Sequence, residues 1–152
     1  MDFLPIFVNV RQRVCVVVGG GAIALHKTNL LLRAGADVLV VSPELCAALT
    51  QLHAKGAIRW LTQPFTTECL EGAMLVIAAT DDEVVNRYLS TVAQAHNIPV
   101  NVVDAPQLST FVMPSIIDRS PVVVAVSSGG AAPVLTRLLR ARLETLIPAA
   151  TC

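Results

Sequence analysis

The 152-residue chain has the composition of a compact globular domain, which excludes several classes of protein. Hydrophobic residues make up 54% of the sequence, charged residues only 14%, and eleven basic residues balance eleven acidic ones. A chain of this length buries roughly 70% of its unfolded surface, enough for a core without disulfides or metal ions. The even charge balance excludes a basic surface for nucleic acid, and the apolar runs are too short for a membrane-spanning helix.

The cysteines give no sign of a metal centre or of a secreted scaffold. Cys15, Cys46, Cys69 and Cys152 form neither a C-x-x-C pair nor the spacing of a metal site. The N-terminus carries no recognisable signal peptide or lipidation motif. We therefore expect a protein of the reducing cytoplasm that holds no metal ion of its own.

A glycine motif follows the first apolar run. Gly19-Gly20-Gly21-Ala22-Ile23-Ala24 has the form G-x-G-x-x-A and stands between a predicted strand and a predicted helix. In this context the motif predicts a bound dinucleotide. Gly19 would make the tight turn, Gly21 would let the backbone approach a pyrophosphate, and Ala24 would keep the helix close to the strand. The positive end of the helix dipole would then face the phosphates.

Strands and helices alternate over the first two thirds of the chain. Apolar runs predict strands at 14–18, 38–41, 58–61, 75–79 and 99–103. Helical patterns occupy residues 22–34, 44–55 and a segment ending near 96. Short runs rich in Val, Ile and Ala are typical of strands buried on both faces of a parallel sheet. The alternation predicts an α/β fold with a Rossmann-like, doubly wound parallel sheet of order 3-2-1-4-5.

The pattern changes after residue 104. Residues 110–113 and 116–117 are expected to form strands or a tight hairpin, residues 122–126 a sixth strand, and residues 132–146 a helix with a leucine stripe. We therefore divide the chain into an NAD-binding Rossmann domain at 1–108 and a C-terminal strand and helix extension at 109–152. The excess of apolar residues fits either buried strands or a subunit interface, and both interpretations stay open.

Ligands of such sheets lie across the carboxyl ends of the strands, so the residues there are candidates for the site. The second predicted strand ends at Ser42, where NAD enzymes often place an acid for the ribose hydroxyls. Glu44, two residues later, is a substitute candidate, although it also fits the first turn of a helix. No arginine follows closely, which favours NAD over NADP.

Acidic residues also follow the fourth and fifth predicted strands. Asp81 and Asp82 stand within Thr80–Glu83, which has the spacing of a capping box, so helix initiation explains them better than catalysis. Asp104 is a candidate proton acceptor beside a nicotinamide, or it bonds turn amides ahead of Pro106. The loop Ser127–Gly130 could bind an anionic substrate group or cap the last helix.

Several motifs longer than the glycine motif make the chain similar to one particular family. These motifs are Leu4–Phe7, Val16–Ala24 before Lys27, Ile77–Asp82, Asn101–Asp104, Phe111–Pro121, Ala125–Gly130 and Pro133–Leu135. On these residues the sequence resembles the N-terminal module of sirohaem synthase, the precorrin-2 dehydrogenase and sirohydrochlorin ferrochelatase family. The resemblance implies oxidation of precorrin-2 to sirohydrochlorin with NAD⁺, and it raises a second activity, the insertion of Fe²⁺ as a substrate to give sirohaem.

The resemblance also implies roles for individual residues. The key aspartate of the family falls on Asp104, which favours a catalytic role for it, and Asn101 and Ser128 become candidates for substrate contacts. The residues expected to face the cofactor are Gly19, Gly20, Gly21, Ala22, Ile23, Pro43, Glu44 and Thr80. One carboxylate beside the macrocycle would serve both reactions, so no metal cage within the protein is expected.

The chain departs from the family in two places. His26-Lys27 stands where members often carry Arg-Lys. The chain ends at Cys152, whereas relatives continue into a helical segment that helps to form a homodimer, so we expect a fragment or a shortened member without methyltransferase activity. Two other functions stay open: a non-catalytic NAD-binding regulatory domain, and a remnant that mainly dimerises through the stripe Leu135–Leu146.

Overall fold

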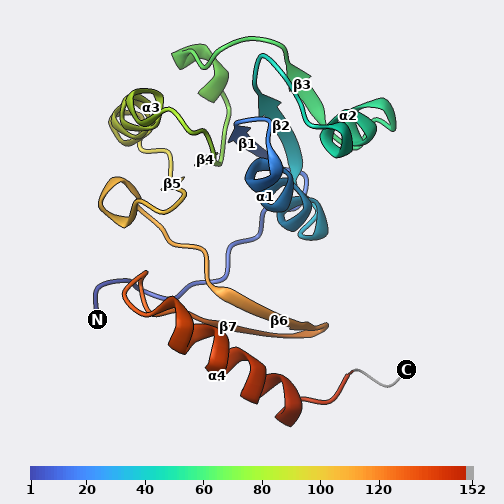
Figure 1. The fold of residues 1–152 in the computed structure, drawn as a ribbon, viewed down its shortest axis with the longest axis vertical. Coiled ribbons are helices and arrows are strands. Elements are labelled where there is room, and N and C mark those ends of the chain that lie inside the picture. The colour runs from blue at the N-terminus through green and yellow to red at the C-terminus, as the bar shows by residue number, and fades with distance from the viewer. Residues whose placement is uncertain (150–152) are drawn as a thin grey trace. The chain divides into compact units, whose positions relative to one another are not determined.

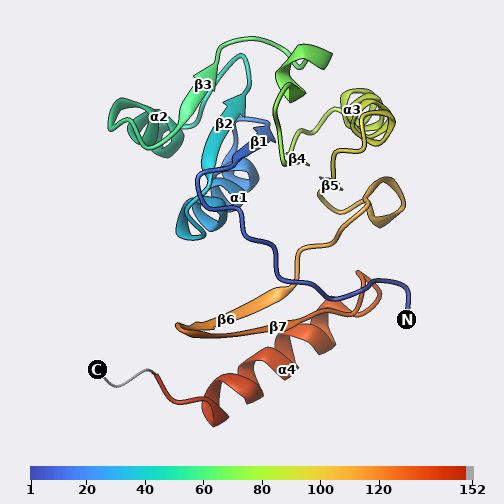
Figure 2. The ribbon, with the colours of Figure 1, turned by 180° about the vertical axis from the view of Figure 1, so that it is seen from behind.

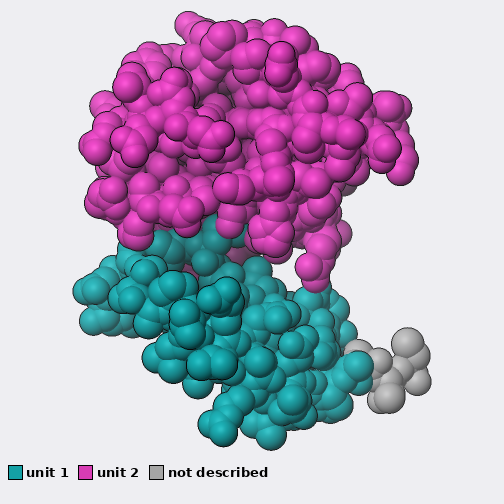
Figure 3. All heavy atoms as spheres, viewed as in Figure 1, with its two compact units in different colours: residues 1–4, 112–152 teal, residues 5–111 magenta. Residues whose placement is uncertain are grey.

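The computed structural model describes residues 1–149 of the chain. Its contacts divide the chain into two compact units, coloured separately in Figure 3. We call residues 5–111 the sheet unit, and residues 1–4 together with 112–149 the hairpin unit. The end of the predicted C-terminal extension, residues 150–152, lies outside the described residues.

The sheet unit is built on five parallel strands. They are β1 (Val14–Val18), β2 (Asp37–Val41), β3 (Arg59–Leu61), β4 (Leu75–Ala78) and β5 (Val100–Val102). The strands follow the order β3-β2-β1-β4-β5, with every neighbouring pair parallel. The predicted α/β class and strand order are therefore confirmed, because the connections between successive strands return the chain to the same end of the sheet and keep the strands parallel.

Helices cover both faces of this sheet. They are α1 (Ala22–Arg33), α2 (Ala47–Ala54) and α3 (Glu83–Ala95), with the short 3-10 helices η1 (Thr67–Leu70) and η2 (Pro106–Leu108). Residues of α1 and α2 pack with one set of strand side chains, whereas α3 and η1 pack with the opposite set. Figures 1 and 2 show these layers from opposite sides.

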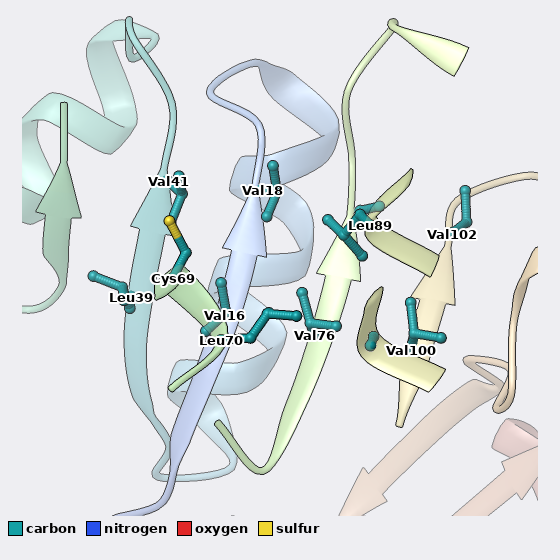
Figure 4. Close-up of a cluster of buried hydrophobic side chains, with 12 residues drawn as sticks. Val16, Val18, Leu39, Val41, Cys69, Leu70, Val76, Leu89, Val100 and Val102 are labelled. Atoms are coloured by element: carbon teal, nitrogen blue, oxygen red, sulfur yellow. The ribbon is translucent and has the colours of Figure 1, made fainter. Parts of the chain in front are cut away.

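The strand sequences explain the double-sided core. In Figure 4, Val16 and Val18 of β1 point to the same face as Val76 and Val100 of the neighbouring strands, where they meet Leu89 of α3. The alternate residues of β1 pack on the other face, and almost all of these valines are completely buried. Since both faces are dry, the strand ends are the only part of the sheet where polar chemistry can take place.

Two helix starts differ from the sequence prediction. The helix expected from residue 44 begins at Ala47, because the Cys46 amide donates to the Gly20 carbonyl oxygen at 2.7 Å and holds the preceding loop against the glycine turn. The interpretation of Glu44 as a first-turn acid is therefore wrong. The capping box with Thr80 as the cap is also wrong, because Asp82 is the N-cap of α3 and accepts hydrogen bonds from the Val84 and Val85 amides.

The strand expected at 110–113 is absent from the described structure. Instead, Ser109 and Thr110 bond the free edge of β5: Thr110 Oγ1 accepts from the Val100 amide and Ser109 Oγ from the Val102 amide, each at 2.9 Å. The Thr110 amide also donates to the Val100 carbonyl oxygen at 2.7 Å. Hydroxyls and backbone bonds together thus satisfy this edge of the sheet without a further strand.

The hairpin unit carries its own small sheet. β6 (Ser115–Arg119) and β7 (Val122–Val126) pair antiparallel, so the predicted sixth strand belongs to this hairpin rather than to the parallel sheet. The helix α4 (Pro133–Leu146) packs on it, and Arg140 Nε donates to the Ile116 carbonyl oxygen at 2.9 Å. Arg140 also pairs with Glu144, one turn further along the same helix, at 3.4 Å.

Within residues 1–149 no helix is long and apolar enough to span a membrane. The same part of the chain contains no group of three or more His, Cys, Asp or Glu side chains arranged to hold a metal ion.

Candidate functional site

The glycine turn after β1 is packed so closely that two of its residues have no room for a side chain. Gly19 has a φ of 131°, and a Cβ there would overlap the Ala79 carbonyl oxygen. A Cβ on Gly20 would overlap the Glu44 carbonyl oxygen. A Cβ on Gly21, by contrast, would meet nothing within 4 Å. The turn is therefore closed on the protein side and open at Gly21, which is where a ligand could approach the backbone.

The start of α1 is left free for an anion. Gly21 is the N-cap and provides no side-chain hydrogen bond, and the first turn contains no acidic residue. The amides of the first turn are thus without the usual cap, and they carry the positive end of the helix dipole. Ala24, predicted to keep the helix close to the strand, is completely buried. These features fit a pyrophosphate at Gly21–Ile23.

A groove of about 570 Å³ lies over the carboxyl ends of β1, β2 and β4. This volume is typical of small-molecule sites. The groove is lined by seven of the eight predicted cofactor-binding residues: Gly19, Gly20, Gly21, Ala22, Ile23, Pro43 and Thr80. Glu44 does not line the groove; its side chain is exposed beside Pro43.

The loop between β2 and α2 forms one wall of the groove and is held by hydrogen bonds. Ser42 Oγ donates to the Glu44 carbonyl oxygen at 2.7 Å, and the indole of Trp60 on β3 donates to the Ser42 carbonyl oxygen at 2.8 Å. Trp60 is the single tryptophan of the chain. Its position makes it a natural fluorescence reporter for a ligand that enters the groove.

A reciprocal pair of side-chain bonds fixes the loop after β4. Thr80 Oγ1 donates to Asn86 Oδ1 at 2.6 Å, and Asn86 Nδ2 donates back to the Thr80 carbonyl oxygen at 3.1 Å. Asn86 is nearly buried on α3. Asn86 is not among the residues predicted from the sequence, because its partner lies in the loop and not on the same helix face. The pair holds Thr80 at the groove wall.

Asp104 stands at the tip of β5 in an unusual conformation. Its φ is 61°, the left-handed region that Asp enters more readily than most residues but at some cost. Its side chain is exposed and lines a second hollow, which shares Thr80 and Asp81 with the groove. Among the described residues its carboxylate makes no hydrogen bond and no ion pair. The alternative that Asp104 bonds the turn amides ahead of Pro106 is therefore wrong.

A lysine that the sequence analysis did not select lies near this carboxylate. Lys27 is on α1, one turn after Ile23, and is half-buried. Burial lowers the pKa of the Lys27 ammonium, and the negative charge of Asp104 opposes this shift. The signal that could have found Lys27 is its spacing, since a residue four positions after Ile23 faces the same side of the helix.

The two predicted substrate contacts are both engaged within the protein. Asn101 is buried on β5, and its Nδ2 donates to the Phe111 carbonyl oxygen at 3.1 Å. Ser128, in the hairpin unit, accepts a hydrogen bond from the Ala132 amide at 2.9 Å, just ahead of α4. These bonds give each side chain a structural role, and their contact with a substrate stays a prediction.

The fold and the glycine groove together define a dinucleotide-binding domain of the Rossmann type. The family model described as "Putative NAD(P)-binding" matches residues 6–115, and the chain belongs to this family. A second model, described as "Sirohaem biosynthesis protein central", matches residues 119–146. The predicted nicotinamide dinucleotide cofactor is thereby confirmed for the sheet unit.

Curated relatives that match nearly the whole chain include siroheme synthases. The chain is 63% identical over 149 residues to that of Methylobacillus flagellatus and 57% identical over 154 residues to that of Nitrosospira multiformis. These matches cover 98% and 99% of this chain but only 32% and 33% of the relatives, so the chain spans about a third of their length. The predicted resemblance to sirohaem synthases is confirmed.

A solved structure described as "SirC, precorrin-2 dehydrogenase" resembles the chain over both units. The TM-score is 0.84 at 26% sequence identity, and the match covers 97% of this chain and 72% of that one. The likeness therefore includes the hairpin, β6 and β7, as well as the Rossmann sheet.

Proposed function

We propose that this chain is an NAD-dependent precorrin-2 dehydrogenase that produces sirohydrochlorin for sirohaem biosynthesis. The observation that carries the proposal is the unpaired Asp104 carboxylate, held in a strained conformation beside a dinucleotide groove. The strained backbone is costly, and such strain persists where function requires it. The similarity to siroheme synthases and to a precorrin-2 dehydrogenase supports the same reaction.

The proposed oxidation removes two electrons and two protons from the macrocycle. They leave as one hydride and one proton. NAD⁺, when bound, supplies the hydride acceptor. The amides at the start of α1 would hold its pyrophosphate, and Gly21 would leave room for it. Asp104 would accept the proton while the C–H bond that loses the hydride breaks. The products are then sirohydrochlorin, NADH and a protonated Asp104 that releases its proton to water.

The choice of NAD over NADP rests on the charges around the groove. Its lining within the described residues includes Asp81 and Asp82 and no lysine or arginine. A 2′-phosphate would therefore find no cationic partner there, whereas ribose hydroxyls could donate to a carboxylate. Glu44 remains our candidate for that contact, since its exposed side chain stands beside Pro43 at the groove wall.

A second activity, insertion of Fe²⁺ into sirohydrochlorin, is favoured by the same unpaired carboxylate. Metal insertion requires removal of two pyrrole protons, and Asp104 could accept them in turn. Iron would enter as a substrate. Iron insertion by the full chain without NAD⁺ tests this activity, and a rate equal to the uncatalysed one would exclude it.

We also infer that the chain forms a homodimer through the hairpin unit. Leu135, Leu138 and Leu146 of α4 are 54%, 61% and 75% exposed, a large apolar stripe for a free surface. We place this dimer in the cytoplasm, since the described cysteines, Cys15, Cys46 and Cys69, are all free thiols.

The dehydrogenase proposal is tested by following NADH formation when the full chain is mixed with precorrin-2 and NAD⁺. We expect catalytic formation of NADH and the absorbance spectrum of sirohydrochlorin. Trp60 fluorescence measures NAD⁺ binding separately in the same samples. Binding of NAD⁺ without any turnover would instead favour the non-catalytic regulatory domain, in which Asp104 is dispensable.

A further inference from the structure

The groove extends to both sides of the glycine turn, and the proposed reaction uses only one of them. The strand order places the loops after β2 and β3 on one side of β1, and the loops after β4 and β5 on the other (Figure 1). Asp104 follows β5, so the proposed function puts the nicotinamide half of the dinucleotide on the side of β4 and β5. The adenosine half then falls on the side of β2 and β3.

Two prolines line the groove on the side of β2 and β3. Pro43 follows β2, Pro64 stands in the loop between β3 and η1, and both are exposed. Their loops leave the sheet at the same end, because Val41 of β2 is paired with Leu61 of β3. A proline offers an apolar ring and has no amide hydrogen to donate. Pro64 is not among the residues predicted from the sequence, since only the pairing of β3 with β2 brings it to the groove.

The polar groups on this side of the groove are already used within the protein. Ser42 provides the single polar side chain among the lining residues here, and its hydroxyl donates to the Glu44 carbonyl oxygen at 2.7 Å. Its amide donates to the Leu61 carbonyl oxygen at 3.2 Å, and its carbonyl oxygen accepts from the Trp60 indole at 2.8 Å. Among the described residues that line this side beyond the end of β2, no hydrogen-bond donor is therefore left for the edge of a base.

We propose that Pro43 and Pro64 hold the adenine of the dinucleotide by apolar contact, and that this side of the groove accepts another purine equally well. The inference rests on the proposed function, which requires a dinucleotide in the groove. Burial of the faces of an aromatic base supplies affinity without regard to its edge. A donor facing the bare N1 of adenine would reject hypoxanthine, which carries a hydrogen there, but no such donor is free.

The test compares NAD⁺ with two analogues on the full chain, with Trp60 fluorescence as the measure of binding. The hypoxanthine analogue keeps both rings of the base and lacks the 6-amino group, whereas the cytosine analogue keeps an amino group on a single ring. We expect a Kd for the hypoxanthine analogue within about threefold of that for NAD⁺. The cytosine analogue should bind about tenfold more weakly, because it buries less apolar surface. A larger loss with hypoxanthine, or a cytosine analogue that binds as tightly as NAD⁺, would overturn the inference.

A pair of proline variants tests the contact itself. Pro64→Ala removes part of the ring and should raise the Kd for NAD⁺ and for the hypoxanthine analogue by the same factor, about fivefold. Pro99→Ala is the matched control, since Pro99 is an exposed proline that precedes β5 at the opposite end of the sheet. It should leave both Kd values unchanged. An unchanged Kd in Pro64→Ala, or a loss confined to one of the two purines, would contradict the proposed contact. If Pro64→Ala melts below the control, the analogue series on the unaltered chain decides.

The measurements also separate this inference from the proposed function. If both purine dinucleotides bind alike but precorrin-2 is not oxidised, the dehydrogenase proposal fails and the base site stands. If precorrin-2 is oxidised with NAD⁺ while the hypoxanthine analogue is rejected, the inference is wrong and the dehydrogenase proposal stands.

Discussion

The two ends of the proposed site differ in whether their polar groups have hydrogen-bond partners within the protein. At the glycine turn the polar groups of the surrounding loops are satisfied: Cys46 bonds Gly20, Ser42 bonds the Glu44 carbonyl, and Trp60 bonds Ser42. At the tip of β5, Asp104 has a strained backbone and no partner for its carboxylate among the described residues, and Lys27 nearby has none either.

On the proposed function, the first end would bind the cofactor and the second would take part in the reaction. A cofactor that is held by backbone amides needs a rigid cradle, and close packing around Gly19 and Gly20 provides it. A proton acceptor must instead keep its lone pairs available until the substrate arrives. Substitutions at the first end should therefore affect folding or cofactor affinity, and substitution of Asp104 at the second should affect turnover.

The largest expected effect is at Asp104. Asp104→Asn keeps the size of the side chain and tolerates the positive φ, so the fold and the Kd for NAD⁺ should be retained. Loss of the proton acceptor should lower kcat for precorrin-2 oxidation by about a hundredfold or more. NADH formation and Trp60 fluorescence measure the two quantities. Turnover at the wild-type rate would remove Asp104 from the chemistry.

A pair of glycine variants sharpens the comparison within the turn. Gly19→Ala should destabilise the sheet unit by about 2 kcal/mol or more, because of the φ of 131° and the overlap with Ala79. Gly21→Ala has free space and should leave the melting temperature unchanged, but its methyl group would stand where the pyrophosphate approaches, so the Kd for NAD⁺ should rise about tenfold. Equal stability of the two variants would contradict this account of the turn.

The hairpin unit should respond differently from both ends of the site. Leu138→Glu on the exposed stripe of α4 is expected to weaken the dimer about thirtyfold or more, as a charge at an apolar interface does. Analytical ultracentrifugation over a range of concentrations measures this. Gln51→Glu on exposed α2 adds the same charge elsewhere and should have no effect. A wild-type chain that remains monomeric at all concentrations would exclude the dimer.

The start of α3 distinguishes the observed cap from the one expected from the sequence. Asp82→Ala removes the side chain that accepts from the Val84 and Val85 amides and should cost about 1 kcal/mol. Glu83→Ala should cost much less, whereas a true capping box beginning at Thr80 would make Glu83 a partner of the cap. Urea denaturation of the two variants decides between these assignments.

The last prediction concerns Cys15, whose effect appears only at high pH. Burial raises the pKa of its thiol from 9.0 to about 11. Because the unfolded thiol ionises first, the stabilisation is complete below pH 9.0 and is lost as the pH rises toward 11. The urea midpoint should therefore fall over this range, and by less in Cys15→Ala. An identical decline in the variant would show that other groups cause it.

The parts of the fold that the sequence predicted are those fixed by local pattern. The runs of valine, isoleucine and alanine defined the strands, and the glycines at 19–21 marked the turn where two backbones approach closely. The local pattern also predicted the alternation of strands and helices, from which the strand order was inferred. In each case the local sequence was enough to predict the element.

The errors arose where a distant part of the chain decides the local structure. The start of α2 depends on a bond from Cys46 to Gly20, and the irregular path of 109–111 depends on the edge of β5. Lys27 was missed although its spacing from Ile23 was visible in the sequence, because the charge of Asp104, which acts on it, comes from a distant part of the chain. The predicted roles of Asn101, Ser128 and Glu44 stay predictions.

The central claim, that Asp104 and a bound nicotinamide act on the same macrocycle, is tested most directly by a crystal structure of the chain with NAD⁺ and sirohydrochlorin. We predict the pyrophosphate at the start of α1 and an Asp104 oxygen within hydrogen-bonding distance of the macrocycle, directly or through one water. A dinucleotide outside the glycine groove, or an Asp104 carboxylate turned away from the macrocycle, would contradict the account.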